Sequence, residues 1–163
     1  MLPYIIDVEA SGFGAGSYPI EIGIVMPDRE THCFLVKPEP DWVHWDAQAA
    51  GVHGIDRQEL VRLGKPVAEI AQCLNELLGR EVIYTDAWGV DSSWIAKLYD
   101  AADAVPSFRL ETLRKIISEP QVALWTATKN TVIRELDLKR HRASADATIL
   151  QQTFERSQAM LNK

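Results

Sequence analysis

The chain is poor in cysteine and contains no long apolar run. Only 2 of its 163 residues are cysteines, Cys33 and Cys73, and no further Cys or His is spaced around them as a metal ligand. This argues against a zinc site and against a disulfide scaffold. We expect two buried thiols in a reducing cytoplasm.

No apolar stretch approaches the roughly 18 residues of a membrane helix, and the first residues do not resemble a signal peptide. The sequence therefore predicts a cytoplasmic protein with no membrane contact.

Basic residues are also few: 17 against 23 acidic ones, for a formal net charge of −6. Proteins whose whole surface binds long nucleic acid are usually basic. The charge argues against such a binder, but not against an enzyme that acts on nucleic acid. Apolar residues make up 47% and charged residues 25%, as in ordinary globular proteins. The length favours one domain, residues 1–163.

Hydrophobic patterns predict strands first and helices later. Strands are expected at residues 3–8, 20–26, 31–36 and 81–85, with the second and third paired as an antiparallel hairpin. Helices are expected at residues 66–78, 92–102, 119–136 and 145–161. Residues 38–64 indicate a loop with a short helix, and residues 108–113 a strand or a helix start. This order favours an α/β domain with a mixed sheet.

A glycine-rich segment with Gly12, Gly14 and Gly16 follows the first expected strand. A dinucleotide-binding fingerprint needs a helix to begin there, so that phosphate lies at the helix N-terminus. Here Pro19 and a β-rich run follow instead, and no Lys-Ser or Lys-Thr pair makes the segment a P-loop. We interpret it as a mobile loop.

Two carboxylates, Asp7 and Glu9, stand at the end of the first expected strand. Residues two apart on a strand point to the same face, so these side chains would repel each other unless a cation lay between them. Mg²⁺ and Mn²⁺ prefer such oxygen ligands. The alternative is a solvated strand end, which is favoured for an Asp-x-Glu taken alone.

A second polar group precedes the last expected helix. Ser144 is a suitable N-cap, which would leave His141 in the loop and Asp146 in the first turn, where both can converge on one point. The alternative is an Asp that merely complements the helix dipole. Between the two groups, Asp91 begins a helix, where a simple cap is its ordinary role, and Asp86 is a competing carboxylate.

In order and spacing, these segments resemble the DEDDh exonucleases, the DnaQ-like branch of the ribonuclease H-like fold. The first motif, Asp-x-Glu, is matched by Asp7 and Glu9, and the Glu-Ile-Gly and His-Gly-Ile elements by residues 21–23 and 53–55. The second motif is matched by Asp91, Trp94 and Ile95, and the third, His-x-Ala-x-x-Asp-Ala, by His141, Ala143, Asp146 and Ala147. The Trp94-Ile95 sequel favours Asp91 over Asp86.

The resemblance implies a ribonuclease H-like three-layer fold, with helices on both faces of a mixed five-stranded sheet. It implies 3′–5′ hydrolysis of single-stranded or short nucleic acid, RNA slightly favoured, with release of nucleoside 5′-monophosphates. A DNA proofreading or repair exonuclease is the alternative, and a non-catalytic nucleic-acid-binding module is the third reading. Some relatives are dimers, which leaves a homodimer open.

The resemblance also implies the roles of individual residues. Asp7, Glu9, Asp91 and Asp146 would hold two divalent ions, Mg²⁺ or Mn²⁺, with His141 as the general base. Contacts to the terminal nucleotide are expected from Ala10, Ser11, Gly12, Phe13, His53 and Trp94.

Overall fold

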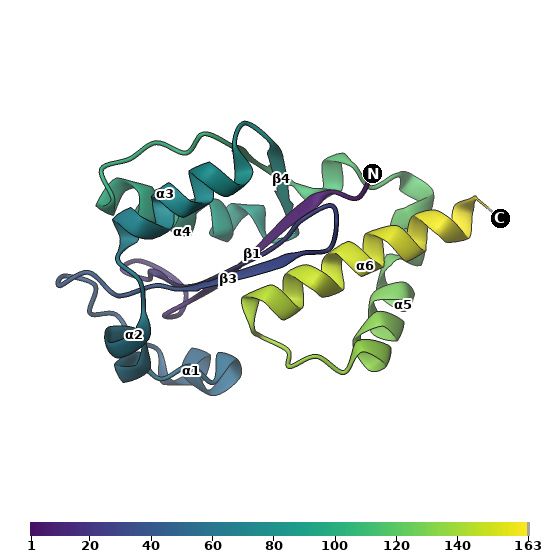
Figure 1. Ribbon diagram of the computed structural model, residues 1–163. Helices are drawn as coiled ribbons and strands as arrows, with labels where there is room; N and C mark the ends of the chain where they lie inside the picture. The colour runs from purple at the N-terminus through teal and green to yellow at the C-terminus, as the bar shows by residue number, and fades with distance from the viewer. Residues whose placement is uncertain (163) are drawn as a thin grey trace.

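A mixed five-stranded sheet in the order β3-β2-β1-β4-β5 runs through the centre of the computed structural model, which describes residues 1–162 (Figure 1). The strands are β1 (Tyr4–Ala10), β2 (Pro19–Val25), β3 (Thr31–Leu35), β4 (Val82–Thr85) and β5 (Arg109–Thr112). β2 pairs antiparallel with both β1 and β3, whereas β4 pairs parallel with both β1 and β5. The predicted hairpin and mixed sheet are confirmed.

Helices cover both faces of this sheet. They are α1 (Ala47–His53), α2 (Arg57–Leu63), α3 (Val67–Leu78), α4 (Trp88–Ala101), a 3₁₀ turn (Leu113–Lys115), α5 (Glu119–Leu136) and α6 (Ala143–Leu161). α6 packs across β1 and β2 with α5 against it, while α4 packs on the opposite face and α3 packs on α4 (Figure 1). The three layers confirm the predicted architecture.

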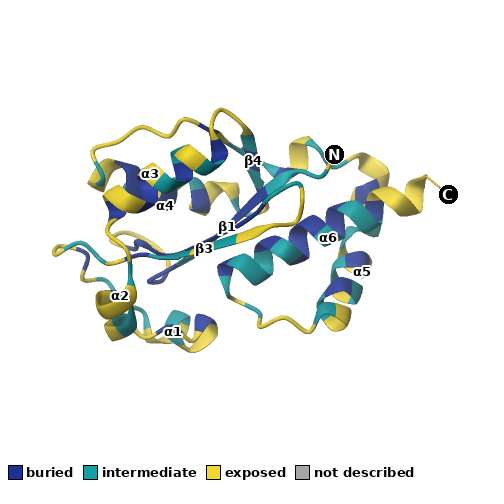
Figure 2. Cartoon of the chain, in the orientation of Figure 1, coloured by how far each residue is buried: buried dark blue, intermediate teal, exposed yellow. Residues whose placement is uncertain are grey.

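The buried residues of β1 divide the core into two parts, because successive side chains of a strand point to opposite faces. Ile6 and Val8 pack in the cluster that includes α3 and α4, whereas Ile5 packs with Leu150 and Phe154 of α6. Burial is concentrated on the strands and on the sheet-facing sides of the helices (Figure 2). By the same alternation, the odd-numbered carboxylates of β1 lie on the α6 side of the sheet.

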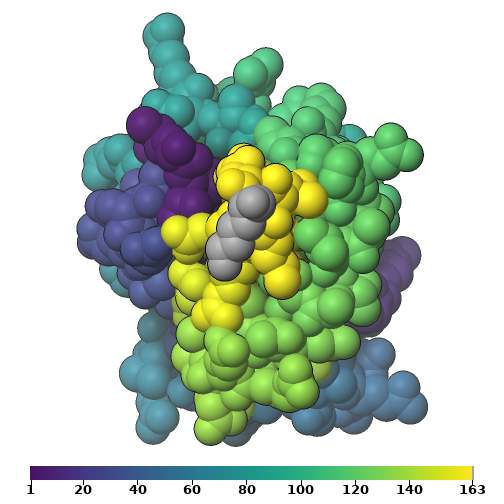
Figure 3. Space-filling model, turned by 90° about the vertical axis from the view of Figure 1, so that its right-hand side faces the viewer, coloured from purple at the N-terminus to yellow at the C-terminus, as the bar shows by residue number. Residues whose placement is uncertain are grey.

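The face formed by α5 and α6 also receives the first residues of the chain (Figure 3). The Nε2 amide of Gln151 donates hydrogen bonds to the carbonyl oxygens of Pro3 and Met26, both at 2.8 Å. α6 is therefore fixed to one end of the β1–β2 pair, where β1 begins and β2 ends. None of the helices among residues 1–162 has the length and apolar character that crossing a membrane requires.

Two helix starts differ from the prediction. α4 begins at Trp88, not at residue 92, and Asp91 lies within its first turn and is not its cap; the N-cap is Ala87, which makes no side-chain capping bond. α6 begins at Ala143 with Arg142 as its N-cap, so Ser144 is not the cap. Neither start has a local capping residue, so the sequence carried no signal for it.

Two further expectations were wrong. Residues 38–64 contain two short helices, α1 and α2, each capped by an aspartate, Asp46 and Asp56. Neither thiol is fully buried: Cys73 is partly exposed, and Cys33 is exposed. Cys33 lies on β3, the edge strand, and one face of that strand is open to solvent.

Candidate functional site

The carboxyl end of β1 meets the first turns of α4 and α6 at one edge of the sheet. β1 contributes Asp7 and Glu9, α4 contributes Asp91, and α6 contributes Asp146. The loop before α6 contributes His141. These five residues are more than 130 positions apart in sequence at the extremes, yet the parallel and antiparallel pairings of β1 bring their elements to one place.

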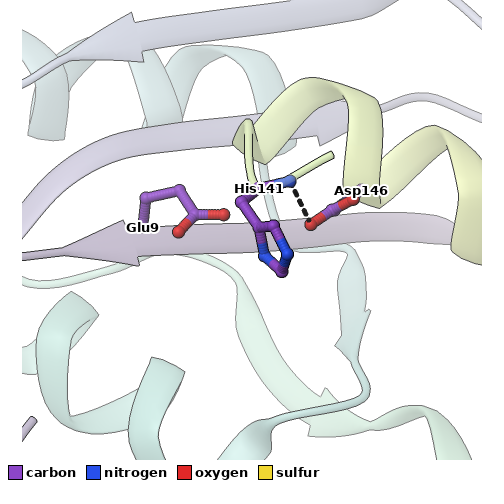
Figure 4. Close-up of side chains that lie close together, drawn as sticks. All are labelled: Glu9, His141 and Asp146. Carbon is purple, nitrogen blue, oxygen red and sulfur yellow. Dashed lines mark hydrogen bonds between the residues drawn. The ribbon is translucent and has the colours of Figure 1, made fainter. Parts of the chain in front are cut away.

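Glu9, His141 and Asp146 form the tightest group (Figure 4). Each offers one ligand atom, and these atoms all lie within 4.8 Å of one another. The backbone N–H of His141 donates to Asp146 Oδ2 at 3.1 Å, and Arg140 Nε donates to Asp146 Oδ1 at 2.7 Å. His141 has a φ of 59°, in the left-handed region that residues other than glycine seldom adopt. This conformation directs the chain so that imidazole and carboxylate share one site.

The carboxylates of Asp7, Glu9 and Asp91 are partly or fully buried, and neighbouring negative charges repel them. Burial raises the pKa of Asp7 well above its ordinary value, and the charges of Asp91 and Glu9 raise it further. Burial, with the nearby charge of Asp146, raises the pKa of Glu9 to about 7. Burial likewise raises the pKa of Asp91 to about 7, against the hydrogen bond from Thr85, which lowers it. Strongly shifted carboxyl pKa values beside a cavity are typical of functional sites.

Asp91 and Asp86 have different surroundings. Asp91 is 1% exposed and accepts a hydrogen bond from the Thr85 hydroxyl at the end of β4. Asp86 is exposed and pairs with Lys129 of α5 at 3.2 Å. The buried, oriented carboxylate is therefore that of Asp91.

A cavity of about 330 Å³ opens beside the carboxylates. Its lining includes Asp7, Glu9, Asp91 and His141 together with Ala10, Gly12, Phe13, His53 and Trp94, all of them expected from the sequence. Ala49 and Val52 of α1 and Val90 of α4 also line it. Sequence reasoning missed these three, because neither motif nor spacing marks an apolar helix residue as part of a cavity wall.

Ser11 is the expected contact residue that does not line the cavity. It is fully buried, and its hydroxyl bonds to His44 Nδ1 at 2.9 Å and accepts from the N–H of Tyr18 at 3.1 Å. Its carbonyl accepts from the N–H of Asp46 at 2.8 Å. Ser11 thus holds the glycine-rich loop against the start of α1, and its contact with the terminal nucleotide stays a prediction.

His53 presents an unpaired donor in the cavity wall. Its Nδ1 accepts a hydrogen bond from the N–H of Ile55 at 3.0 Å, so the ring proton lies on Nε2. Nε2 is buried and has no hydrogen-bond partner among the described residues. Burial lowers the pKa of His53, with the charge of Glu21 opposing this shift. A neutral, buried N–H without a partner is costly, so a hydrogen-bond acceptor beside it would stabilise the site.

The Glu-Ile-Gly segment of β2 positions the start of α6. Glu21 is fully buried; Arg142 Nε and Nη2 donate to its carboxylate at 2.9 and 2.5 Å, and the N–H of Ala143 donates at 2.7 Å. At Gly23, a Cβ would lie 2.1 Å from the backbone of Ala143. The glycine thus allows α6 to approach the sheet, and the glutamate caps the helix across the fold. The sequence revealed the motif but not this role.

These residues fit hard divalent cations. Burial and then neighbouring negative charges raise the pKa of three of the four carboxylates, so a bound cation would favour their ionised forms. Oxygen donors of this kind suit Mg²⁺ or Mn²⁺, and a histidine beside them can accept a proton from water. Chemically, the arrangement can hold cations and deprotonate a water next to a bound phosphate.

No family model matches the chain, and no curated protein matches it in sequence. Among solved structures, exonuclease I of E. coli in complex with a dA16 oligonucleotide matches 97% of this chain with a TM-score of 0.71 and 16% identity. Exonuclease I from Methylocaldum szegediense matches 97% of this chain with a TM-score of 0.71 and 13% identity. The fold is ribonuclease H-like.

A zinc-ion-bound form of the E. coli exonuclease I–ssDNA complex also matches, with a TM-score of 0.67, 15% identity and 97% of this chain covered. In all three cases the match covers 41% of the exonuclease I chain. This chain therefore spans about two fifths of the length of those proteins, and the ribonuclease H-like fold is the part that they share.

Proposed function

We propose that residues 1–163 form one DEDDh (DnaQ-like) domain with metal-dependent 3′–5′ exonuclease activity on single-stranded or short nucleic acid. The observation that carries this proposal is the meeting of Asp7, Glu9, Asp91, Asp146 and His141 beside one aromatic-walled cavity. Structural similarity to exonuclease I supports it.

Within this proposal, Asp7, Glu9, Asp91 and Asp146 hold two divalent ions, Mg²⁺ or Mn²⁺. When bound, such ions supply the positive charge that favours formation of hydroxide and stabilises the leaving 3′-oxygen. His141 accepts the proton of the attacking water on a ring nitrogen, a role that suits imidazole because its ordinary pKa is about 6.5. The products are a nucleoside 5′-monophosphate and a chain shortened by one nucleotide.

The cavity receives the terminal nucleotide. Phe13 and Trp94, whose ring centroids lie 5.9 Å apart, form an aromatic wall for the base. Trp94 is held in place by a hydrogen bond from Nε1 to the Ser17 hydroxyl at 3.0 Å. The buried Nε2–H of His53 donates to an acceptor of that nucleotide.

RNA is the first candidate substrate, and DNA is the second. The observation that favours DNA is that exonuclease I structures similar to this chain were solved with dA16 and dT13 oligonucleotides. A non-catalytic binding module would need neither the imidazole nor all four carboxylates.

The decisive experiment uses 5′-labelled single-stranded RNA, single-stranded DNA and blunt duplexes, with Mg²⁺ or Mn²⁺ and with or without chelator. We expect ladders that shorten from the 3′ end, only when metal is present, and the ranking of rates to identify the sugar. Endonucleolytic fragments, or equal turnover in chelator, would contradict the proposal.

Asp7→Asn serves as the matched control. It removes one ligand charge from a repulsive cluster, so it should abolish turnover while the fold remains intact. Wild-type turnover in this variant would sink the metal-site assignment.

A further inference from the structure

The terminal-nucleotide cavity is the first of three adjoining hollows. Asp7 lines it and also lines a second, polar cavity of about 150 Å³. Asp86 lines that second cavity and also a groove of about 280 Å³ beside the 3₁₀ turn and α5. Because neighbouring hollows share a lining residue, they adjoin in series from the carboxylates to α5, and we call this series the path.

The second cavity carries two cations. Lys129 of α5 lies 3.2 Å from Asp86, and Arg140 lies 2.7 Å from Asp146. Both cations line this second cavity, and neither lines the first. Asp7, Asp86 and Asp146 line the same cavity, so these two cations are the lining groups that can attract a phosphate oxygen.

The third hollow combines an aromatic ring, apolar side chains and a further cation. Trp125 of α5 lines it with Leu113, Ile117 and Val122, and the exposed Arg114 stands at its border. An indole beside a guanidinium is a surface on which a nucleic-acid base can stack.

We propose that this path is the binding site for the nucleotide on the 5′ side of the scissile bond, a conclusion that rests on the proposed exonuclease function. Lys129 and Arg140 contact its phosphate, and Trp125 and Arg114 hold its base. The order of the hollows matches the order of groups in a dinucleotide. An apolar cavity comes first, then the carboxylates, the cations and a second aromatic groove.

The consequence for the substrate is that its last two bases lie in separate hollows. Bases separated in this way are not stacked in a duplex, so the strand must be unpaired at its 3′ end. The path thus selects single strands over blunt duplexes.

The test compares two substrates that differ only in whether a second nucleotide is present. The 4-nitrophenyl ester of thymidine 5′-monophosphate offers one nucleotide, whereas hexathymidylate offers the full path; the uridine ester and hexauridylate are run in parallel. We expect Arg114→Ala and Trp125→Leu each to raise KM for the hexanucleotide about tenfold, while kcat/KM for the ester changes less than twofold.

Two controls make the result specific. Arg134→Ala removes an exposed cation from the same helix, α5, that lines none of the three hollows, and it should leave both KM values unchanged. Trp125 packs against the α6 core, so its variant is compared at equal folded fraction, and Trp125→Phe should restore most of the hexanucleotide affinity.

The outcomes distinguish failure of the second-nucleotide site from failure of the proposed exonuclease function. If the wild type hydrolyses neither substrate, the exonuclease function fails. If the wild type hydrolyses both, and the Arg114 and Trp125 variants change neither KM or change both equally, the second-nucleotide site is overturned.

Discussion

At the scale of the residue, His141 combines an unusual backbone conformation with a catalytic position. Its φ of 59° is one that asparagine tolerates better than alanine does. His141→Asn therefore removes the imidazole without adding backbone strain. We expect kcat to fall about 10²–10⁴-fold, measured on a single-stranded oligonucleotide at saturating metal.

The thermal midpoint of the same variant provides the control. It should stay within a few degrees of the wild type, because the N–H of residue 141 still donates to Asp146. An unchanged kcat in a folded variant would remove the general-base role from His141.

The buried carboxyl of Asp91 makes the stability of the metal-free protein depend on pH. Its pKa rises from 3.8 to about 7 on folding, so the protonated form favours the folded state. The stability that this group contributes is present below about pH 4 and is lost as pH rises through about 7. At pH 8, Asp91→Asn should be the more stable protein, by a difference on the order of 2–4 kcal/mol.

Urea unfolding in chelator at pH 5 and pH 8 measures this difference. The gap between Asp91→Asn and the wild type should be wide at pH 8 and narrow at pH 5. Asp41→Asn alters an exposed carboxylate and should differ from the wild type by less than about 0.5 kcal/mol at both pH values. A gap that does not change with pH would contradict the burial argument.

At the scale of the element, hydrophobic periodicity located most strands and helices within a few residues. α5 was predicted at its observed bounds, and its start is fixed locally by a capping box between Ser118 and Gln121. α6 was predicted two residues late because its cap is Glu21, which lies on β2. Contacts between distant elements leave no local pattern, which is why the boundary was wrong.

The features of the site divide in the same way, into those with a local sequence signal and those that depend on contacts between distant elements. Carboxylates in motif order were visible in the sequence, since spacing and residue type carry that signal. The cavity walls supplied by α1, the orphaned Nε2 of His53 and the buried pair of Glu21 with Arg142 depend on tertiary packing. No periodicity reports them.

The contact between β2 and α6 gives a prediction for Gly23. A Cβ at this position would lie 2.1 Å from the backbone of Ala143, and backbone cannot move aside without displacing the helix. We expect Gly23→Ala to destabilise the protein by about 3 kcal/mol or more and to lower activity by shifting His141 and Asp146.

Gly51→Ala is the matched control for this substitution. Gly51 lies within α1, and a Cβ there would meet nothing within 4 Å. It should raise the free energy of unfolding by about 0.5–1 kcal/mol, as alanine does in a helix interior. Equal effects at both glycines would refute the close approach of α6.

At the scale of the whole molecule, repulsion among the site carboxylates links metal to stability. Two divalent ions that bind only the folded state, at 100 times their dissociation constant, should each add about 2.7 kcal/mol. For a domain of this size, each such addition raises the thermal midpoint by about 5–10 °C. Calorimetry with and without chelator checks this, and Asp7→Asn should lose most of the increase.

The net charge of −6 takes on a more specific meaning with the site located. Four acidic residues belong to the carboxylate cluster, and the cations along the proposed strand path are few. We expect the affinity of Asp7→Asn for a single strand to depend weakly on salt, with a log–log slope of about −2. A slope steeper than about −4 would indicate an extensive basic surface in place of this short path.

The position of β1 has a consequence for how the site moves. β1 pairs with strands on both sides and lies at the middle of the order β3-β2-β1-β4-β5, so its amide protons should exchange with deuterium only on global unfolding. His141 lies in a loop, whose protons exchange through small local openings. Asp7 and Glu9 are therefore anchored on the most slowly exchanging element and His141 on one of the fastest. Local opening of the 137–142 loop can thus withdraw the imidazole while these two carboxylates stay in place.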